Sequence, residues 1–346
     1  MTDRSITRRN FGSSAAGLAA AAALPSLAAS RTFAADTVHH GIQIGALGAL
    51  RTTLPDAGKK YDLAYDIRDF PDSTAVLLAI EQGALDIGNT TSQHLVRAIS
   101  EGIPVRWVSG WGGGYNVLVA RKDLGVKPSD PHGLKTLIDL RKQSGKPLSV
   151  GVPTGSLQHA KLAVYLKTIG VDPDKDVQVS NIPFQAHPRA LQAGEVDMAM
   201  TLSGFGALAI NKGDAYLYLQ LFGGSFGKQE VGFLVSQKLT QDRPELVQRI
   251  VQSHVDAMNL FIGKPDMQVK YEKAYSRFPA PVIEMNEGHF LHYNYRTNVA
   301  DIKTMARELN DLGWVKEDYS NKVDSYIDLS FLTKATGLSI AELSQW

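Results

Sequence analysis

The sequence predicts an α/β protein made of two doubly wound lobes, which are joined by crossing strands and separated by a ligand cleft. Three observations predict this fold. First, about 311 residues follow an N-terminal targeting segment, which is more than one hydrophobic core usually serves. Second, short strand patterns alternate with helix patterns, as in a mainly parallel sheet covered by helices. Third, the pattern starts again in the second half of the chain.

Residues 1–35 have the composition of a secretory signal. A charged start, Thr7-Arg8-Arg9-Asn10-Phe11, precedes an Ala-rich apolar run from Ala15 to Leu27, and small residues follow at Thr32–Ala35. This order is typical of a cleaved signal peptide, and the paired arginines resemble the twin-arginine type. The alternative is a membrane anchor, but the apolar run is shorter than the roughly 20 residues that span a bilayer. We therefore expect export to the periplasm by the twin-arginine machinery.

Charge and cysteine content narrow the class of protein. Residues 1–35 hold four arginines and one aspartate, so the remaining chain has 32 basic and 34 acidic residues, and its formal net charge falls from +1 to −2. Such a chain has no overall electrostatic attraction to nucleic acid or to an anionic membrane. The sequence contains no cysteine, which excludes thiolate metal sites, thiol nucleophiles, disulfides and a lipid-anchored N-terminus.

The first half of the chain alternates strand and helix patterns. Leu63, Tyr65 and Ile67 alternate with polar residues, as in a half-buried strand, and the following helix pattern ends at Gly83. The expected strands are Gly41–Gly45, Leu63–Ile67, Leu85–Gly88, Val105–Ser109 and Val117–Ala120, and the expected helices are Ser73–Gln82 and Ser92–Ser100.

The second half repeats this order. The helix end, glycine and aspartate at Ala79–Asp86 resemble those at Ala190–Asp197, at the same place in each half. The expected strands are Leu148–Val152, Val177–Ile182 and Val196–Thr201, and the expected helices are Ser156–Ile169 and Gln185–Ala193. Farther along, apolar residues at helical spacing predict core-facing helices over Leu246–Ile262 and around Met305–Leu312.

Two connections define the expected lobes. Lys122–Lys146, rich in charge, Pro and Gly, is expected to leave the first lobe, and a second crossing is expected between Leu217 and Val235. We expect the hinge near Val119–Lys122 and Leu219–Gly224. The predicted divisions are a signal peptide (1–35), the first part of lobe 1 (36–121), lobe 2 (122–222), and the return to lobe 1 with the C-terminal helices (223–346).

Three segments resemble one protein family. Leu77–Gly88 reads Leu-Leu-Ala-Ile-Glu-Gln-Gly-Ala-Leu-Asp-Ile-Gly, Leu148–His159 contains the more specific Gly-Ser-x-x-His element, and Phe184–Met198 ends in Gly-Glu-Val-Asp-Met. In this order and spacing they resemble the periplasmic nitrate/sulfonate/taurine-binding family, which also includes binders of thiamine-type pyrimidines. The resemblance covers roughly residues 40 to 260. It implies a periplasmic binding protein-like fold and delivery of a ligand to an ABC permease driven by a separate ATPase.

Candidate ligand-binding residues cluster at three expected helix starts, Pro71–Thr74, Asn89–Ser92 and Thr154–Ser156. Ligands of doubly wound sheets bind beyond the carboxyl ends of strands, and helix N-termini suit anions. The alternative is that these residues are ordinary helix caps. The full set of candidates is Phe70, Asp72, Ser73, Thr90, Thr91, Trp111, Thr154, Gly155, Ser156, His159, Ser203 and Phe205.

Individual candidates carry different expectations. Thr154–Ser156 are expected to donate to an anionic group, with His159 behind them and Trp111 over the apolar part of the ligand. Trp111 and His159 have a structural alternative in the core, and Asp72 either caps its helix or meets a cationic group of a zwitterion. The family often has a Trp-Asp-Pro-Tyr-like segment where this chain has Leu202–Gly206, so the sequence leaves the ligand open.

No catalytic motif of the common hydrolase, metalloprotease or nucleotide-binding classes occurs in the sequence. The pair His39-His40 is expected to be solvated rather than to bind metal. We therefore expect a monomeric binding protein without cofactor or catalytic site, which captures a small organic anion, sulfonate-like or related. The alternatives are a ligand-binding sensor that contacts a receptor, and a binder of a pyrimidine-like or aromatic nutrient.

Overall fold

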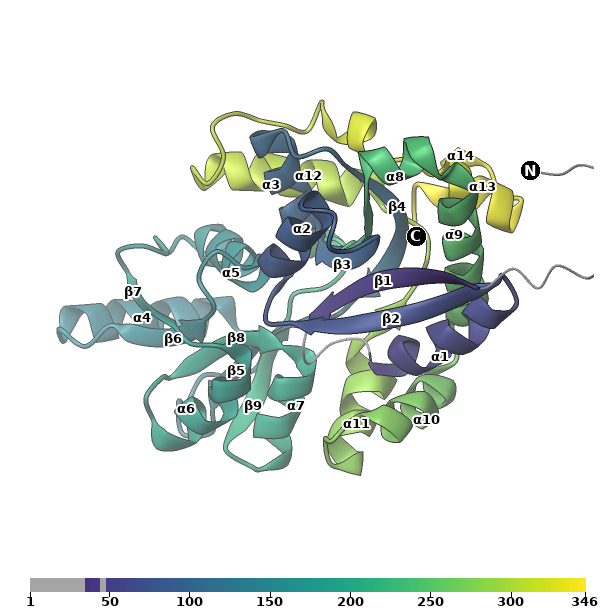
Figure 1. Ribbon diagram of the computed structural model, residues 1–346. Coiled ribbons are helices and arrows are strands. Elements are labelled where there is room, and N and C mark those ends of the chain that lie inside the picture. The colour runs from purple at the N-terminus through teal and green to yellow at the C-terminus, as the bar shows by residue number, and fades with distance from the viewer. Residues whose placement is uncertain (1–34, 44–47) are drawn as a thin grey trace, which may run out of the picture. The chain divides into compact units, whose positions relative to one another are not determined.

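The computed structural model describes residues 35–43 and 48–346 (Figure 1). Residues 1–34 of the predicted signal segment and the last two residues of the expected strand Gly41–Gly45 lie outside these residues. In the part of the chain that is described, no helix is both long and apolar enough to cross a lipid bilayer.

Residues 35–346 contain two β-sheets. The first sheet has the strand order β11-β4-β10-β3-β1-β2. Its strands are β1 (Asp36–Gln43), β2 (Leu63–Phe70), β3 (Ile87–Thr91), β4 (Val105–Gly113), β10 (Val231–Ser236) and β11 (His292–Tyr293). The second sheet has the order β7-β6-β8-β5-β9. Its strands are β5 (Asn116–Arg121), β6 (Leu148–Val152), β7 (Val177–Asn181), β8 (Met198–Leu202) and β9 (Ala215–Gln220).

The two sheets share one topology, which confirms the predicted duplication. The order β2-β1-β3-β10-β4 in the first sheet matches β7-β6-β8-β5-β9 in the second. Both sheets are mixed rather than mainly parallel. In each, three strands pair in parallel, whereas β10 and β5 are antiparallel to both of their neighbours. These two strands directly follow the crossings between the sheets, so they enter from the opposite direction.

Helices cover both faces of the first sheet (Figure 1). One face packs against α1 (Gly48–Lys59), α9 (Pro244–Met258), α10 (Pro265–Tyr275) and α13 (Ser330–Thr336). The other packs against α2 (Ser73–Glu81), α3 (Ser92–Glu101) and α12 (Val299–Asp311). The short elements α8 (Gln237–Asp242), η4 (Val323–Tyr326) and α14 (Ile340–Leu343) complete this half.

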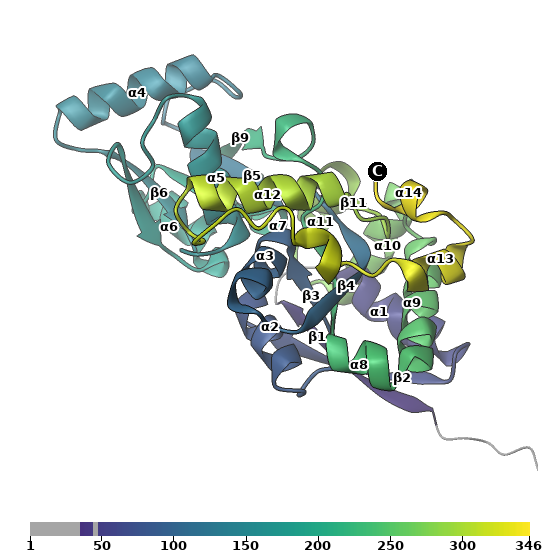
Figure 2. The ribbon, with the colours of Figure 1, turned by 90° about the horizontal axis from the view of Figure 1, so that it is seen from above.

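Helices also cover both faces of the second sheet. One face packs against α4 (Pro131–Gln143) and α5 (Leu157–Thr168), and the other against α6 (His187–Ala193), α7 (Ser203–Asn211) and α11 (Ala280–Met285). Three short elements are η1 (Phe184–Ala186), η2 (Gly224–Phe226) and the π-helix η3 (Asn286–Phe290). Seen from above, α12 extends from the first half toward α5 (Figure 2), where Lys167 Nζ donates to the Asp311 carbonyl at 2.9 Å.

The segment Lys122–Lys146, expected to be a connection, contains the helix α4. Asp130 Oδ1 accepts from Gly133 N at 2.9 Å, and Pro131 occupies the first turn, so this helix has a regular start. Leu134 and Ile138 are buried against the second sheet. The charged residues of α4 are half-buried or exposed, so the composition of the segment resembled that of a connection.

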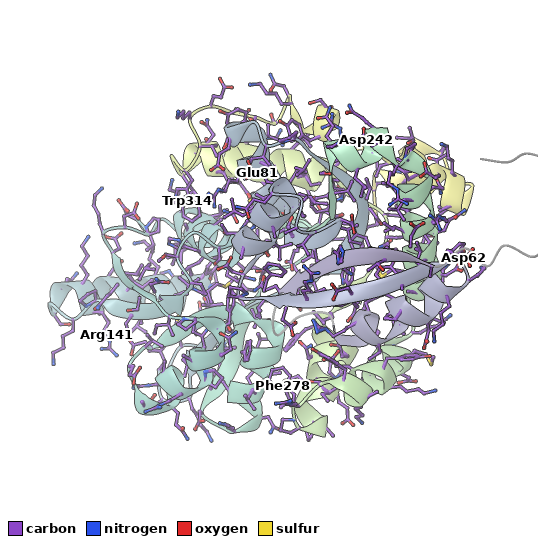
Figure 3. All side chains as sticks on the ribbon, viewed as in Figure 1. Asp62, Glu81, Arg141, Asp242, Phe278 and Trp314 are labelled. Atoms are coloured by element: carbon purple, nitrogen blue, oxygen red, sulfur yellow. The ribbon has the colours of Figure 1, made fainter. Side chains whose placement is uncertain are left out.

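The chain crosses between the sheets at Gly113–Asn116 and at Gln220–Val231. The expected hinge segment Val119–Lys122 instead begins inside β5, which pairs with β8 and β9. The second expected segment, Leu219–Gly224, overlaps the second crossing. Residues 223–346 were expected to return to lobe 1, but helix α11 in this segment packs on the second sheet. Figure 3 shows Phe278 between α7 and α11, and its ring lies 5.5 Å from that of Phe205.

Candidate functional site

A cavity of about 120 Å³ lies between the two sheets, where the starts of three helices converge. Ser73 and Thr74 begin α2, Thr91 precedes α3, and Leu157 and Gln158 begin α5, and all five line the cavity. The first backbone N–H groups of a helix have no carbonyl partner in that helix, and the helix dipole is positive at this end. The cavity wall therefore carries partial positive charge from three directions.

Asp72 is the N-cap of α2. Its Oδ1 accepts from Ala75 N at 2.8 Å, so this oxygen caps the helix, which was one of the two roles expected for Asp72. Ser73 Oγ donates to Gln43 Oε1 at 2.9 Å, and all three side chains line the cavity. The Asp72 carboxylate is exposed, so its other oxygen stays accessible.

The start of α5 is held by its own side chains. Ser156 Oγ accepts from His159 N at 3.2 Å and donates to the Pro153 carbonyl at 2.6 Å. Gly155 N donates to His159 Nδ1 at 3.1 Å, and Thr154 N donates to an asparagine side chain. These donors, which were expected to face an anion, are engaged within the protein. The donors left at this helix start are the Thr154 hydroxyl and the backbone N–H groups of Leu157 and Gln158.

Asn89 on β3 is a lining residue with an unsatisfied side-chain amide. Its Oδ1 lies 2.6 Å from His40 Nε2, and its Nδ2 has no hydrogen-bond partner among the described residues. The Asn89 residue is 2% exposed and lines the cavity. His40, expected to be solvated, is fully buried, and burial lowers its pKa to about 4. It is therefore neutral at pH 7 and belongs to the core.

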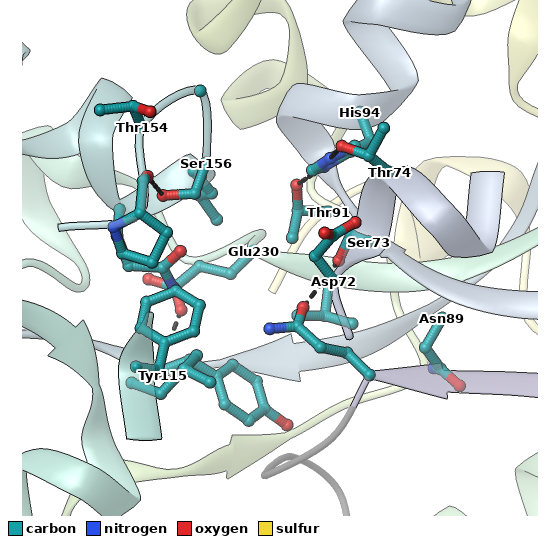
Figure 4. Close-up of a pocket in the computed structure, with 18 residues that line it drawn as sticks. Asp72, Ser73, Thr74, Asn89, Thr91, His94, Tyr115, Thr154, Ser156 and Glu230 are labelled. Carbon is teal, nitrogen blue, oxygen red and sulfur yellow. Dashed lines mark hydrogen bonds between the residues drawn. The ribbon is translucent and has the colours of Figure 1, made fainter. Parts of the chain in front are cut away.

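His94 on α3 lies between two hydroxyls that also line the cavity (Figure 4). Its Nδ1 is 2.7 Å from Thr91 Oγ1, and its Nε2 is 3.1 Å from Thr74 Oγ1. Burial, together with the charge of Arg97, lowers the pKa of His94 to about 4. The ring is thus neutral at pH 7.

Glu230, one partner of a buried ion pair, lies on the opposite wall of the cavity. Glu230 Oε1 lies 3.1 Å from Lys161 Nζ, and Glu230 Oε2 accepts from Tyr115 N at 2.8 Å. Figure 4 shows Glu230 and Tyr115 on the same side as Thr154, facing Thr91 across the gap. Burial raises the pKa of the Tyr115 hydroxyl, so this group is a neutral donor. No Lys or Arg occurs among the described residues that line the cavity.

Six of the predicted site residues line the cavity, and six do not. The six that line it are Asp72, Ser73, Thr91, Thr154, Gly155 and Ser156. Trp111 is fully buried in an aromatic cluster, where its ring lies 4.8 Å from Phe233 and 5.3 Å from His254, so it does not cover the cavity. His159 lies behind Gly155, as expected, with its ring 4.7 Å from Trp314.

The other four lie outside the lining for reasons of strand and helix geometry. Thr90 alternates with Asn89 and Thr91 along β3, so its side chain faces the other side of the sheet. Ser203 and Phe205 on α7 are buried. Phe70 ends β2 and packs on the apolar cluster around α2.

Twelve lining residues are not among the individual candidates. They are Gln43, Thr74, Asn89, His94, Tyr115, Pro153, Leu157, Gln158, Phe184, Leu202, Glu230 and Val231. Asn89 and Thr74 belong to the helix starts Asn89–Ser92 and Pro71–Thr74 that the sequence indicated, although they were not among the individual candidates. Tyr115, Glu230 and Val231 belong to the crossings, and no local pattern indicated that these segments form a wall.

Residues 56–272 match the model of the NMT1-like family. The chain belongs to the NMT1-like family. This NMT1-like chain is 26% identical over 222 residues to the taurine-binding periplasmic protein of Escherichia coli (strain K12), across 63% of this chain and 64% of the relative. The match thus spans just under two thirds of the length of that relative. The predicted resemblance to nitrate-, sulfonate- and taurine-binding proteins is confirmed.

Solved structures share the fold of this NMT1-like chain at low sequence identity. The alkanesulfonate-binding protein of Xanthomonas axonopodis pv. citri, bound to MOPS, has a TM-score of 0.69 and 16% identity, over 84% of this chain and 98% of that one. The nitrate-binding protein of Synechocystis PCC 6803 has a TM-score of 0.71 and 13% identity, over 89% of this chain and 90% of that one. A Candida albicans protein described as having the generic periplasmic binding protein fold has a TM-score of 0.62 and 13% identity, over 84% of this chain and 96% of that one. The predicted fold class is therefore confirmed.

Proposed function

We propose that this protein is the periplasmic substrate-binding component of an ABC importer, and that it binds without catalysing a reaction. It captures a small organic anion, sulfonate-like or related, in the cavity between the two sheets. It then delivers the ligand to a membrane permease that a separate ATPase drives. Membership of the NMT1-like family and the relatives that bind taurine, alkanesulfonate and nitrate support this function.

The observation that carries the proposal is the Asn89 amide. A buried N–H donor without a partner costs roughly 1–3 kcal/mol, and such groups in native proteins usually have a partner. Asn89 Nδ2 has none among the described residues, and Asn89 is one of the residues that line the cavity. A ligand oxygen at this place would satisfy it. The free N–H groups at the starts of α2 and α5 would hold further oxygens of the same anion.

A thermal-shift screen of the mature protein tests this function. The probes are alkanesulfonates, taurine, nitrate, small carboxylates, aromatic acids and pyrimidines. A ligand at 100 times its dissociation constant stabilises the folded state by about 2.7 kcal/mol. We expect stabilisation by at least one sulfonate or carboxylate, followed by calorimetric titration. Stabilisation by pyrimidines alone would favour the aromatic-nutrient alternative instead.

The variant Asn89→Asp tests whether the Asn89 amide donates a hydrogen bond to the ligand. Aspartate keeps an oxygen next to His40 Nε2 but replaces the amide donor by an oxygen that repels an anion. We expect about a tenfold or greater loss of affinity. Asn116→Asp is the matched control, because Asn116 is also fully buried with an unsatisfied amide but does not line the cavity. Equal affinity losses in both variants would contradict a role for Asn89 in binding.

Export belongs to the same proposal. The paired Arg8 and Arg9 support a twin-arginine route, whose receptor reads the arginines themselves. Arg8→Lys with Arg9→Lys keeps the charge but loses the guanidinium groups. We expect this double variant to stay in the cytoplasm while the mature domain folds. Normal periplasmic yield of the variant would indicate the general secretory route.

A further inference from the structure

His94 connects two cavity-lining hydroxyls into one chain of hydrogen bonds, which we call the Thr91–His94–Thr74 relay. Thr91 Oγ1 lies 2.7 Å from His94 Nδ1, and His94 Nε2 lies 3.1 Å from Thr74 Oγ1. The ring is the only hydrogen-bond partner of each hydroxyl among the described residues. Residue His94 is 4% exposed and Thr91 is 8% exposed, so bulk water competes little for these two groups, whereas Thr74 is half-buried.

The relay has a fixed number of protons. A neutral imidazole has one N–H donor and one nitrogen acceptor. Burial and the charge of Arg97 lower the pKa of His94, although the Asp72 carboxylate opposes them, so the ring is neutral at pH 7. The ring must then donate to one threonine and accept from the other. The first threonine keeps its own O–H for the ligand, and the second offers only lone pairs.

We propose that His94 is a specificity-determining residue, which makes this wall of the cavity present one donor and one acceptor. A ligand group that only accepts hydrogen bonds can pair with one of the two hydroxyls but leaves the other unsatisfied. A ligand that also carries an N–H or an ammonium group pairs with both. This inference rests on the proposed function and names the ligand class as an organic anion that bears an amino group.

The other residues that line the cavity also favour an anion that bears an amino group. The carboxylate of Asp72 is on the same side of the cavity as the relay, and only one of its oxygens is occupied by capping α2. Glu230 lines the opposite wall, and no Lys or Arg lines the cavity among the described residues. A purely anionic ligand would therefore meet helix starts and carboxylates but no cationic side chain. An amino group supplies the charge that the Asp72 carboxylate complements.

Two matched pairs of probes test the inference by calorimetric titration at pH 7. The pairs are 2-aminoethanesulfonate with ethanesulfonate, and 3-aminopropanoate with propanoate. We expect the amino-bearing member of a pair to bind at least about tenfold more tightly to the unmodified protein. His94→Gln keeps one donor and one acceptor and should keep this ratio. His94→Leu frees both hydroxyl protons and should reduce the ratio to about threefold or less.

Nitrogen NMR of histidine in the ligand-free protein tests the relay without any ligand. We expect His94 to be neutral at pH 7, with one protonated ring nitrogen protected from exchange. A charged ring, or an amino-to-plain ratio near one in the unmodified protein, would overturn the inference and leave the proposed function standing. An unchanged ratio in folded His94→Leu would also overturn it. Binding of none of the four probes would overturn the inference together with the proposed anion binding.

Discussion

Lys161 Nζ lies 3.1 Å from Glu230 Oε1, and this buried pair connects α5 to both crossings between the sheets. The ammonium group also donates to the carbonyls of Leu221 and Phe226 in the second crossing, at 3.1 and 2.9 Å. Glu230 Oε2 accepts from Tyr115 N in the first crossing. One ion pair thus holds α5 against both crossings between the sheets.

Removing one partner of this pair should be costly, because it leaves a buried charge alone. We expect Lys161→Met to lower the free energy of unfolding by about 3–5 kcal/mol. Lys161→Met with Glu230→Gln should recover part of the loss, because the glutamine oxygen still accepts from Tyr115 N without a charge. Urea denaturation measures both. A double variant no more stable than the single one would contradict the buried-charge explanation.

The hydroxyl of Ser156 should contribute to stability rather than to affinity. Its one proton is directed to the Pro153 carbonyl, and its oxygen caps α5 by accepting from His159 N. We expect Ser156→Ala to lower stability by about 1 kcal/mol and to change ligand affinity by less than about threefold. Ser236→Ala is the control, since Ser236 caps α8 in the same way through Leu239 N. A tenfold loss of affinity in Ser156→Ala alone would instead support the donor role expected from the sequence.

The first crossing should not tolerate a side chain at Gly114. This residue has φ +94°, and a Cβ built on it would lie 1.9 Å from the Phe290 carbonyl oxygen. Gly125, with φ +79° and nothing described within 4 Å of such a Cβ, is the control for backbone strain alone. We expect Gly125→Ala to cost about 1–2 kcal/mol and Gly114→Ala about 1–3 kcal/mol more. Equal losses on urea denaturation would show that the backbone at Gly114 adjusts without cost.

The free energy of unfolding should decrease at low pH because buried histidines resist protonation in the folded state. His254 is the clearest case. It is fully buried, its Nε2 lies 2.9 Å from the Gly110 carbonyl, and burial lowers its pKa to about 3. The unfolded chain therefore binds the proton first, at a pKa of about 6.5. The stabilising contribution is complete above that pH and decreases by up to about 1.4 kcal/mol per pH unit as the pH falls toward 3.

The variant His254→Gln tests this contribution, because glutamine keeps an N–H donor for Gly110 but does not titrate. We expect the dependence of unfolding free energy on pH between 6 and 4 to weaken by about 1 kcal/mol per pH unit. His132→Gln is the control, since His132 is exposed on α4. An unchanged slope in His254→Gln would mean that His254 is not the group that titrates.

Ligand binding should bring the two sheets closer. The crossings at Gly113–Asn116 and Gln220–Val231 are the segments that can bend, whereas α11 packs with α7 on the second sheet and would move with it. We expect the radius of gyration from small-angle scattering to decrease on saturation with the probe that stabilises the protein most. An unchanged radius at saturation would count against closure.

Local signals were sufficient to predict most helices and strands. Strand β6 begins and ends where its apolar alternation predicts, and α2 begins after Asp72, as its pattern predicts. Apolar periodicity and N-caps act between residues within one or two helical turns, so a single sequence reveals them. Asp130-Pro131 before α4 is also a typical helix start, but the charged composition of the segment led to the prediction of a connection.

Pairings between distant segments could not be predicted in this way. Lys161 and Glu230 are 69 residues apart, and they meet only because the chain crosses twice between the sheets. The face of β3 that turns Asn89 and Thr91 toward the cavity and Thr90 away from it depends on the pairing of β3 with β1 and β10.

The sequence by itself determined the alternation of strands and helices, the duplicated order, and the helix starts at Asp72 and Ser156, because short-range hydrogen bonds and apolar periodicity set them. The tertiary structure alone decided which side chains share the cavity. Trp111 became part of the core, and Glu230 became part of the cavity wall. The physical reason is that burial and charge pairing depend on neighbours brought together by the order of strands in each sheet, and that order is a property of the whole chain.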